Sequence, residues 1–334
     1  MLILNTFRIF RQYEPLMRER LGDSHRLLYA SQEDEPGILE LLPQVEILVS
    51  NRFTKEYGER CPRLGLLHTP GAGLDKIDLA AIPPGVRLCQ SFGHGPSIAE
   101  YVIMAMIALL RRLLRIDRSL RDGKWMAPQA DPAEGLLEPL SGKTVTILGT
   151  GEIGRAVAGK CRAFEMRTIG INRTGRACGA AFDEVRPLSE LAAVLPGADV
   201  LVVSVPLEKG TRGLIAAREL EAMKASALLV NVARGPVVDE EALFRALSGG
   251  KLAGAAIDVW YDYPPPGSNF RVPSRFPFRK LDNVIMTPHI SGVARSTFDR
   301  RVEDLVFNIE AFASGRPLRH EVRLAPPRHE NHSH

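Results

Sequence analysis

A glycine-rich hexapeptide is the clearest chemical signal in the sequence. Residues 149–154 read G-x-G-x-x-G, directly after the apolar run 145–148 and at the start of a stretch with helical periodicity. In that setting the pattern indicates dinucleotide binding, because unpaired amides at a helix N-terminus can hold a pyrophosphate. We expect Gly149 to permit a tight turn, Gly151 to let the backbone approach the phosphates, and Gly154 to let the helix pack closely on the strand. The alternative is a plain glycine-rich turn.

The end of the next apolar run bears on the choice between NAD and NADP. An acidic side chain there binds the ribose 2′-OH of NAD, whereas arginine accommodates the 2′-phosphate of NADP. Here Asn172 occupies the position of the acidic residue, so the carboxylate that would repel the 2′-phosphate is absent. Arg173 and Arg176 can form charge-assisted hydrogen bonds to it, and Thr174 adds a hydroxyl donor. The pattern favours NADP(H), with NAD(H) possible; two solvated surface arginines are the alternative.

Apolar runs alternate with helical stretches throughout the part of the chain that carries these motifs. About six strands with crossover helices are typical of a doubly wound dinucleotide fold. The strands are expected at 144–148, 168–172, 200–205, 227–232, 254–259 and 284–286, and the helices at 153–164, 189–195, 217–223 and 240–247.

The first ninety residues show the same alternation, which predicts a second set of parallel βαβ units. Strands are expected at 1–6, 25–30, 45–50, 64–69 and 86–91, with helices at 14–21 and 38–42.

A long helix should link the two series, from about Ser97 to Arg121. Pro96 precedes it, and Ser97 and Glu100 have the spacing of a capping box. A surface connection over 123–142 follows. After residue 290 the chain turns helical again at 296–314 and is expected to cross back to the first domain, before a frayed tail at 326–334.

Length and composition exclude several other classes of protein. The chain has 334 residues, 45% hydrophobic and 25% charged, which suits two globular domains and excludes a disordered chain. No apolar run is long enough to span a bilayer. The net charge of +4 is too small to indicate nucleic acid, and four cysteines without CxxC spacing disfavour a zinc site or a disulfide framework. The histidines form no metal-binding pattern, and the segment after Met1 lacks the basic start and the long apolar stretch expected of a signal peptide. A cytoplasmic protein is expected.

The motifs together resemble the D-isomer-specific 2-hydroxyacid dehydrogenases, a family that includes formate and phosphoglycerate dehydrogenases. By motif the resemblance runs from about residue 64 to residue 292. The landmarks besides the glycine loop are Thr69-Pro70-Gly71-Ala72-Gly73-Leu74-Asp75, Ser97-Ile98-Ala99-Glu100, Asn231-Val232-Ala233-Arg234-Gly235, Ala256-Ile257-Asp258-Val259-Trp260 and Thr287-Pro288-His289-Ile290-Ser291-Gly292.

The resemblance implies an α/β fold of two Rossmann-like, doubly wound parallel-sheet domains. A flavodoxin-like, split substrate domain would comprise residues 1–95 and 295–334, and a central dinucleotide-binding domain residues 96–294. The active site would lie between them. The family usually forms homodimers through the cofactor domain and the long helix before it.

The resemblance also assigns roles to individual residues. Arg234 matches the arginine that binds the substrate, and its planar fork suits a carboxylate with a neighbouring carbonyl. His289 matches the acid/base that gives a proton to the new alkoxide. Gly71, Ala72 and Gly73 match a loop whose amides cradle the carboxylate, although a simple turn is the alternative. The residues matched to cofactor binding are Thr150, Gly151, Glu152, Ile153, Asn172, Arg173, Thr174, Arg176, Val205, Pro206, Thr211, Val232, Ala233, Arg234, Asp258, His289, Ser291 and Gly292.

One position departs from the family pattern. Most members carry a glutamate, paired with the histidine, where this chain has Tyr263. A carboxylate would raise the histidine pKa, whereas a phenol is neutral near pH 7 and can only orient the ring. The adjacent Asp262 is expected to point the other way along an extended segment. Formate dehydrogenases also lack the glutamate but place an asparagine where this chain has His94, which is either part of the substrate pocket or an ordinary loop histidine.

Three functions therefore stay open at this stage. The leading one is an NAD(P)-dependent D-2-hydroxyacid dehydrogenase that reduces 2-oxo acids such as glyoxylate or hydroxypyruvate. Oxidation of a small anion such as formate, without proton transfer, is the second. The third is a non-catalytic NAD(P)-sensing protein on the same scaffold. For the first, ketone reduction is expected to fall as pH rises through about 6.5, the ordinary pKa of histidine.

Overall fold

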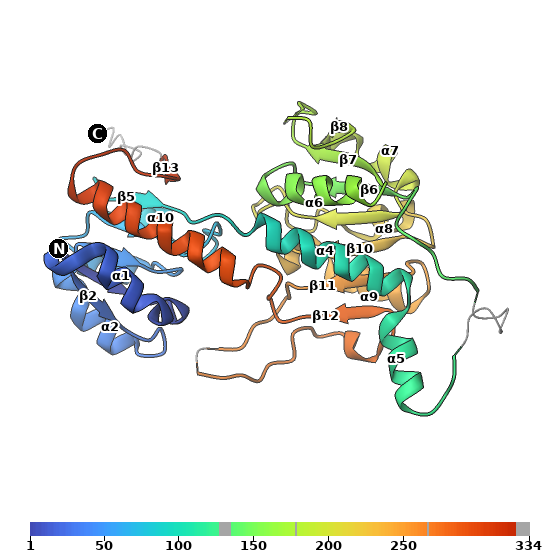
Figure 1. Ribbon diagram of the computed structural model, residues 1–334, viewed down its shortest axis with the longest axis horizontal. Coiled ribbons are helices and arrows are strands. Elements are labelled where there is room, and N and C mark those ends of the chain that lie inside the picture. Colours follow the sequence, from blue (N-terminus) through green and yellow to red (C-terminus); the bar gives the residue numbers. More distant parts are fainter. Residues whose placement is uncertain (127–134, 178, 266, 325–334) are drawn as a thin grey trace, which may run out of the picture. The chain divides into compact units, whose positions relative to one another are not determined.

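A computed structural model of the chain describes residues 1–126, 135–177, 179–265 and 267–324. The chain divides into two compact units. Unit 1 comprises Met1–Gly93 and Arg295–His334, and unit 2 comprises His94–Ala294 (Figure 1). Each unit is an α/β structure built on a largely parallel sheet, which confirms the expected fold class. The assignment of substrate and cofactor roles to residues 1–95 with 295–334 and to residues 96–294 stays a prediction.

The sheet of unit 2 has seven strands in the order β12-β11-β10-β9-β6-β7-β8, all parallel. The order reverses between β6 and β9, as in a dinucleotide-binding fold. The six expected strands are all present, and a seventh, β8, was not expected. The bounds are β6 Thr144–Leu148, β7 Arg167–Asn172, β8 Glu184–Pro187, β9 Val200–Val203, β10 Leu228–Asn231, β11 Gly254–Ile257 and β12 Val284–Met286.

Helices cover both faces of this sheet, because its central strands are apolar on both sides. Val145 and Ile147 of β6 belong to the core shared with α4 and α6. Leu148 at the end of the same strand belongs to the opposite core, shared with α8 and α9. The helices of unit 2 are α4 Gly95–Leu110, α5 Leu113–Arg121, α6 Glu152–Ala163, α7 Leu191–Val194, α8 Ala217–Ala222 and α9 Glu240–Ser248.

The expected long helix over 97–121 is wrong in two respects. It is broken at Arg112, whose φ of 49° is left-handed, so that α4 and α5 are separate helices (Figure 1). The capping box is also wrong, because α4 begins at Gly95 and places Ser97 and Glu100 inside the helix. The Ser97 hydroxyl donates to the carbonyl of Ser291 at 2.8 Å, and Glu100 pairs with Lys160 at 3.1 Å.

The sheet of unit 1 has the order β13-β5-β4-β3-β1-β2. Its five expected strands are parallel in the flavodoxin-like order, and β13 pairs antiparallel with β5. Phe298 on α10 packs edge-on against Phe10, with ring centroids 6.4 Å apart, and so joins this helix to the core of unit 1. The bounds are β1 Leu2–Asn5, α1 Glu14–Leu21, β2 Arg26–Tyr29, α2 Glu35–Leu41, β3 Ile47–Val49, α3 Lys55–Arg60, β4 Leu66–His68, β5 Arg87–Cys89, α10 Arg295–Ala313 and β13 Glu321–Val322.

Two expectations concern segments that the structure describes only in part or not at all. The connection over 123–142 includes residues 127–134, and the tail at 326–334 lies wholly outside the described residues. Among the helices of the described ranges, none has the length and apolar character needed to cross a membrane.

Candidate active site

Most of the expected site residues lie at one edge of the unit 2 sheet. Arg234 follows β10 by three residues, Asp258 follows β11 directly, and His289 follows β12 by three residues. These three strands are adjacent and parallel, so their carboxyl ends share an edge. The glycine loop follows β6 at the same edge, next to the reversal of strand order where such folds bind ligands.

The glycine loop has the geometry that its sequence predicts. Gly149 has a φ of +108°, and a Cβ on it would lie 2.9 Å from the Ser204 hydroxyl. A Cβ on Gly154 would lie 1.9 Å from the carbonyl oxygen of Gly149, so only glycine lets α6 approach this strand so closely. Gly151 is the N-cap of α6, and a Cβ on it would meet only open space. The loop therefore leaves room for a pyrophosphate at the helix N-terminus.

The residues beside these glycines are held from neighbouring elements. The buried Thr150 accepts a hydrogen bond from the Asn172 amide group at 3.1 Å. A carboxylate oxygen of Glu152 accepts from the backbone N–H of Gly95 at 3.1 Å. Ile153 packs on the core beneath α6.

Asn172 shapes the turn after β7. Its side-chain oxygen accepts from the N–H groups of Thr174 at 3.0 Å and Gly175 at 2.7 Å, and its NH₂ group donates to the carbonyl of Arg176 at 2.9 Å. Arg173, Thr174 and Arg176 are exposed on this turn. The same amide reaches Thr150, so one side chain links the turn to the glycine loop. The sequence indicated that Asn172 lacks the negative charge of an acidic residue, but it did not indicate this bridging role.

The hydroxyl of Thr211 stabilises the loop after β9 through two hydrogen bonds within it. This hydroxyl donates to the carbonyl of Pro206 at 2.7 Å and accepts from the N–H of Glu208 at 2.8 Å. Val205 packs against the core of unit 2, and Pro206 is exposed at the edge of the sheet.

The loop that carries Arg234 is fixed by its neighbours along the chain. The side-chain oxygen of Asn231 accepts from the N–H of Ala233 at 3.1 Å, and its NH₂ group donates to the carbonyl of Arg234 at 3.1 Å. Val232 and Ala233 are buried. A Cβ on Gly235 would lie 2.4 Å from the carbonyl oxygen of Trp260. The backbone beside Arg234 therefore lies directly against the segment that leads to Tyr263.

His289 has a φ of +61°, a left-handed conformation that non-glycine residues seldom adopt. The buried carboxylate of Asp258 holds the loop in this shape. It accepts from the N–H groups of Ile290 at 2.8 Å and Ser291 at 2.9 Å, and from the Thr287 hydroxyl at 2.6 Å. Such a strained conformation persists only where its surroundings over-determine it.

Three further side chains support the histidine loop, and the sequence reasoning missed all of these contacts. Trp260 donates from its indole nitrogen to the carbonyl of Thr287 at 2.9 Å. The Tyr101 hydroxyl lies 2.7 Å from the Thr287 hydroxyl, and burial raises the pKa of Tyr101 to about 12. Ser97 bonds to the carbonyl of Ser291, as described above. Two of these residues come from α4, far away in sequence, so no local pattern could have indicated them.

Tyr263 contacts the histidine. Its hydroxyl lies 3.0 Å from Nδ1 of His289, and the backbone N–H of Trp260 donates to the same oxygen at 3.2 Å. A phenol can donate to an unprotonated Nδ1 or accept from a protonated one, so it accompanies both states of the ring. Asp262 is paired with Arg271, consistent with the expectation that it points away from the ring.

His94 is largely buried at the N-terminus of α4. Its Cβ lies 3.5 Å from the position that a Cβ on Gly292 would occupy, which places it against the histidine loop. Within unit 2 the structure therefore brings together the glycine loop, the Arg234 loop, the His289 loop and His94.

Gly71, Ala72 and Gly73 belong to unit 1, in the loop after β4. The carbonyls of this loop are bound from within the unit: Ser91 donates to Thr69 at 3.0 Å, Thr69 donates to Gly71 at 2.7 Å, and Gln90 donates to Ala72. Within the described residues the N–H groups of 71–73 donate no hydrogen bond. The loop therefore presents amide donors.

A buried histidine anchors the start of this loop. Nδ1 of His68 lies 3.2 Å from the carbonyl of Thr69, and Nε2 lies 3.0 Å from the side-chain nitrogen of Asn308. The Asn308 NH₂ group is a donor, so Nε2 accepts and Nδ1–H donates to Thr69. Burial lowers the pKa of His68 to about 4, which keeps the ring neutral.

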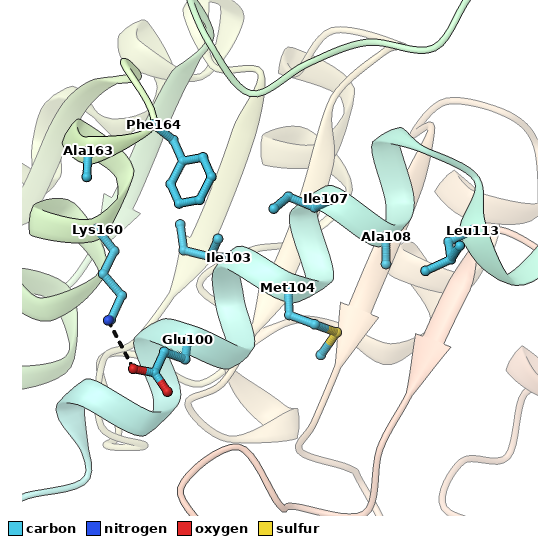
Figure 2. Close-up of a pocket in the computed structure, with 9 residues that line it drawn as sticks. All are labelled: Glu100, Ile103, Met104, Ile107, Ala108, Leu113, Lys160, Ala163 and Phe164. Atoms are coloured by element: carbon cyan, nitrogen blue, oxygen red, sulfur yellow. Dashed lines mark hydrogen bonds and ion pairs between the residues drawn. The ribbon is translucent and has the colours of Figure 1, made fainter.

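A large groove of unit 2 lies apart from all these residues. It has a volume of about 630 Å³. Figure 2 shows it lined by apolar side chains of α4, by Leu113 of α5 and by Ala163 and Phe164 at the end of α6, with the Glu100–Lys160 ion pair at one end. No candidate catalytic residue lines it. Within the described part of the chain, no three His, Cys, Asp or Glu side chains are placed to hold a metal ion.

This arrangement defines a nicotinamide-dinucleotide type of α/β oxidoreductase, and comparison with known proteins agrees. Residues 103–291 match the family model described as the D-isomer specific 2-hydroxyacid dehydrogenase, NAD binding domain. A D-3-phosphoglycerate dehydrogenase of Archaeoglobus fulgidus is 34% identical over 86% of this chain, which spans only 53% of that relative's length. A glyoxylate reductase of Thermofilum pendens is 30% identical over 86% of this chain and 85% of its own.

Solved structures give the same result. A D-lactate dehydrogenase from Aquifex aeolicus, complexed with NAD and lactic acid, is 28% identical with a TM-score of 0.80, covering 94% of this chain and 96% of that chain. The chain belongs to the D-isomer specific 2-hydroxyacid dehydrogenase family, which confirms the resemblance seen in its motifs. It is an oxidoreductase of the class that acts on 2-hydroxy acids.

Proposed function

We propose that the chain is an NADP(H)-preferring D-2-hydroxyacid dehydrogenase that works as a 2-oxo-acid reductase. The observation that carries the proposal is the gathering of the glycine loop, Arg234 and His289 at one edge of the unit 2 sheet. The His289 backbone is held in a strained conformation by Asp258, a buried carboxylate with no other task within the described contacts. A strained backbone held in place by three hydrogen bonds at one histidine supports a catalytic role for that residue.

The proposed chemistry divides the substrate among three groups. The Arg234 guanidinium holds the carboxylate and polarises the neighbouring ketone. The amides of Gly71, Ala72 and Gly73 are proposed to bind a substrate carboxylate. A reduced nicotinamide, when bound, supplies the hydride. His289 donates the proton from Nε2 to the forming alkoxide, while Tyr263 orients the ring through Nδ1. His94 lines the substrate side of the histidine loop.

The cofactor proposal divides the remaining residues by the part of the dinucleotide that each would contact. The loop from Thr150 to Ile153 would hold the pyrophosphate, with Gly151 providing the closest approach. Asn172, Arg173, Thr174 and Arg176 would contact the adenosine ribose and its 2′-phosphate, since the turn exposes both guanidinium groups and carries no carboxylate. The residues proposed to line the nicotinamide end are Val205, Pro206, Thr211, Val232, Ala233, Arg234, Asp258, His289, Ser291 and Gly292.

A panel of 2-oxo acids tests this function. Glyoxylate and hydroxypyruvate are offered with NADPH and with NADH, and oxidation of the cofactor is followed by absorbance. We expect turnover with a higher kcat/KM for NADPH. In the double variant Arg173→Gln, Arg176→Gln, that preference should fall by about tenfold or more, since each charge-assisted hydrogen bond to the phosphate is lost. Tight NADPH binding without turnover of any acid would instead identify a cofactor-sensing protein.

One observation favours a second candidate. The neutral Tyr263 partner supplies no charge to a protonated His289, which suits oxidation of formate, a reaction that transfers no proton. The same panel includes formate with NADP⁺ and NAD⁺. Turnover of formate combined with inactivity toward all 2-oxo acids would support this alternative.

We further propose that the protein is a homodimer that covers the outer face of α4 and α5. Leu113, Leu114 and Leu120 on α5 are about half exposed, and none of the residues of α5 is buried. The apolar groove of Figure 2 continues this surface. Sedimentation equilibrium should give twice the chain mass, and the double variant Leu114→Glu, Leu120→Glu should give the mass of the monomer.

We also propose a cytoplasmic location from the cysteine spacing. Cell fractionation tests this location.

A further inference from the structure

A cationic side chain from the last helix reaches the carboxylate loop of unit 1. Arg301 lies on α10, and its Nη2 atom is 3.9 Å from the position that a Cβ on Gly71 would occupy. Both residues belong to unit 1. The guanidinium therefore lies in van der Waals range of the first residue of the Gly71–Gly73 loop.

The position of this guanidinium is fixed by packing. Its carbon lies 5.4 Å from the ring centroid of Phe298, one helical turn earlier on α10. Phe298 is itself buried against Phe10 in the core of unit 1. A stacked arginine loses less freedom when it binds an anion than a solvated one does, because its side chain is already ordered.

The loop beside Arg301 presents amide donors. The carbonyls of Thr69, Gly71 and Ala72 are occupied by hydrogen bonds from within unit 1, whereas the amides of 71–73 donate none within the described residues. Successive free amides can hold one carboxylate. The forked guanidinium at their edge carries a full positive charge and several further donors, which match a second planar or tetrahedral anion.

We propose that Arg301 is a specificity-determining residue that selects 2-oxo acids carrying a second anionic group, a carboxylate or a phosphate. The 2-oxo carboxylate binds the amides of the loop, and the second anion binds Arg301. This inference rests on the proposed reductase function for its substrate. The anion site itself involves unit 1 alone and is tested without turnover.

The first experiment measures anion binding in the absence of cofactor. Oxalate, a small dianion, is titrated into the full chain while thermal unfolding is followed. The wild-type Tm should rise with oxalate concentration. Arg301→Gln should weaken apparent oxalate affinity at least about tenfold, because a hydrogen bond to a charged group is lost. Arg301→Lys, which keeps the charge without the fork, should fall between them.

Arg300→Gln is the matched control. Arg300 is the preceding residue on the same helix, and its stem lies against Gly93, 3.2 Å from a Cβ placed there. It should bind oxalate as the wild type does. A misfolded Arg301→Gln would lose its cooperative unfolding transition, so the same melting curve shows whether this variant is folded. Arg301→Lys is the second check, because it keeps the positive charge at this position.

The second experiment measures selectivity. For the wild type, kcat/KM should be higher for oxaloacetate or 3-phosphohydroxypyruvate than for glyoxylate, and which of the two is preferred distinguishes a carboxylate from a phosphate. Arg301→Gln should reduce that ratio at least about tenfold. Unchanged oxalate binding and an unchanged ratio in Arg301→Gln would overturn the proposal. A wild type that binds oxalate through Arg301 but reduces no 2-oxo acid would refute the reductase function and leave the anion site standing.

Discussion

The glycine loop and the histidine loop lie at the same edge of one sheet, yet the chain shapes them by opposite means. Residues 149–154 approach the neighbouring backbone closely because Gly149 and Gly154 have no side chain: a Cβ at Gly154 would meet a carbonyl at 1.9 Å. Residues 287–292 keep theirs because Asp258, Trp260 and Tyr101 bond to them. The first loop depends on space, and the second on polar contacts.

This difference separates two kinds of vulnerability. A loop that packs closely because its glycines lack side chains is destabilised when atoms are added at the points of close contact. A loop shaped by contacts is broken by removing partners that lie far away in sequence. The following changes test that division, beginning with the one expected to have the largest effect.

Gly154→Ala should lower the free energy of unfolding by about 3 kcal/mol or more, because the added methyl group collides with backbone that cannot move aside. Gly159→Ala, on the same helix α6, is the control. A Cβ there meets nothing within 4 Å, so this change should raise the free energy of unfolding by about 0.5–1 kcal/mol. Urea denaturation measures both. Equal effects of the two variants would show that close packing does not shape the glycine loop.

Asp258→Asn should lower the free energy of unfolding by about 2–3 kcal/mol, because the amide cannot accept all three hydrogen bonds of the carboxylate. It should also reduce kcat about a hundredfold by displacing His289. The KM for NADPH should change much less than kcat, since the glycine loop has its own supports. A matched loss of NADPH affinity would mean that the two loops are not independent.

His68 extends the comparison to unit 1, where a buried ring anchors the loop after β4. Its pKa is about 4 in the folded protein, against about 6.5 in the unfolded chain. As the pH falls through this window, the unfolded chain takes up a proton that the folded protein cannot. Stability should therefore decrease by about 2 kcal/mol between pH 7 and pH 5. His68→Gln should remove that part of the pH dependence, and urea midpoints at each pH would reveal it.

Tyr263→Phe should have the smallest effect on stability, within about 0.5 kcal/mol, because the tyrosine is 42% exposed. The reduction rate should fall by up to about tenfold as His289 loses its Nδ1 partner. Tyr263→Glu should instead move the pH at which reduction falls to a higher value, since a carboxylate stabilises the imidazolium. A pH profile that is identical in all three proteins would exclude Tyr263 from the proton transfer.

The same division explains what the sequence could predict. Glycines at fixed spacing after an apolar run reveal a loop shaped by space, so the roles of Gly149 and Gly154 were predicted correctly. The buried parallel strands were also found, because both faces are apolar. The edge strand β8 was missed because Glu184-Val185-Arg186-Pro187 is charged, as exposed edges often are.

The supports of the histidine loop could not be predicted, because they are long-range contacts. Ser97 has the spacing of a helix cap, and its hydroxyl instead bonds to Ser291, 194 residues away. The break between α4 and α5 was missed for a different reason. Arg112 adopts its left-handed conformation without a glycine or proline to signal it.

The close approach of Gly235 to Trp260 has a consequence for how this enzyme can vary. That contact lies ahead of the segment 261–280. Asp262 in this segment pairs with Arg271, and its N–H donates to the carbonyl of Pro273 at 3.1 Å. These two contacts hold Asp262 against Arg271 and Pro273. Changes to the chain between these contacts should therefore leave the backbone beside Arg234 in place, which makes this segment a suitable site for grafting a different substrate wall.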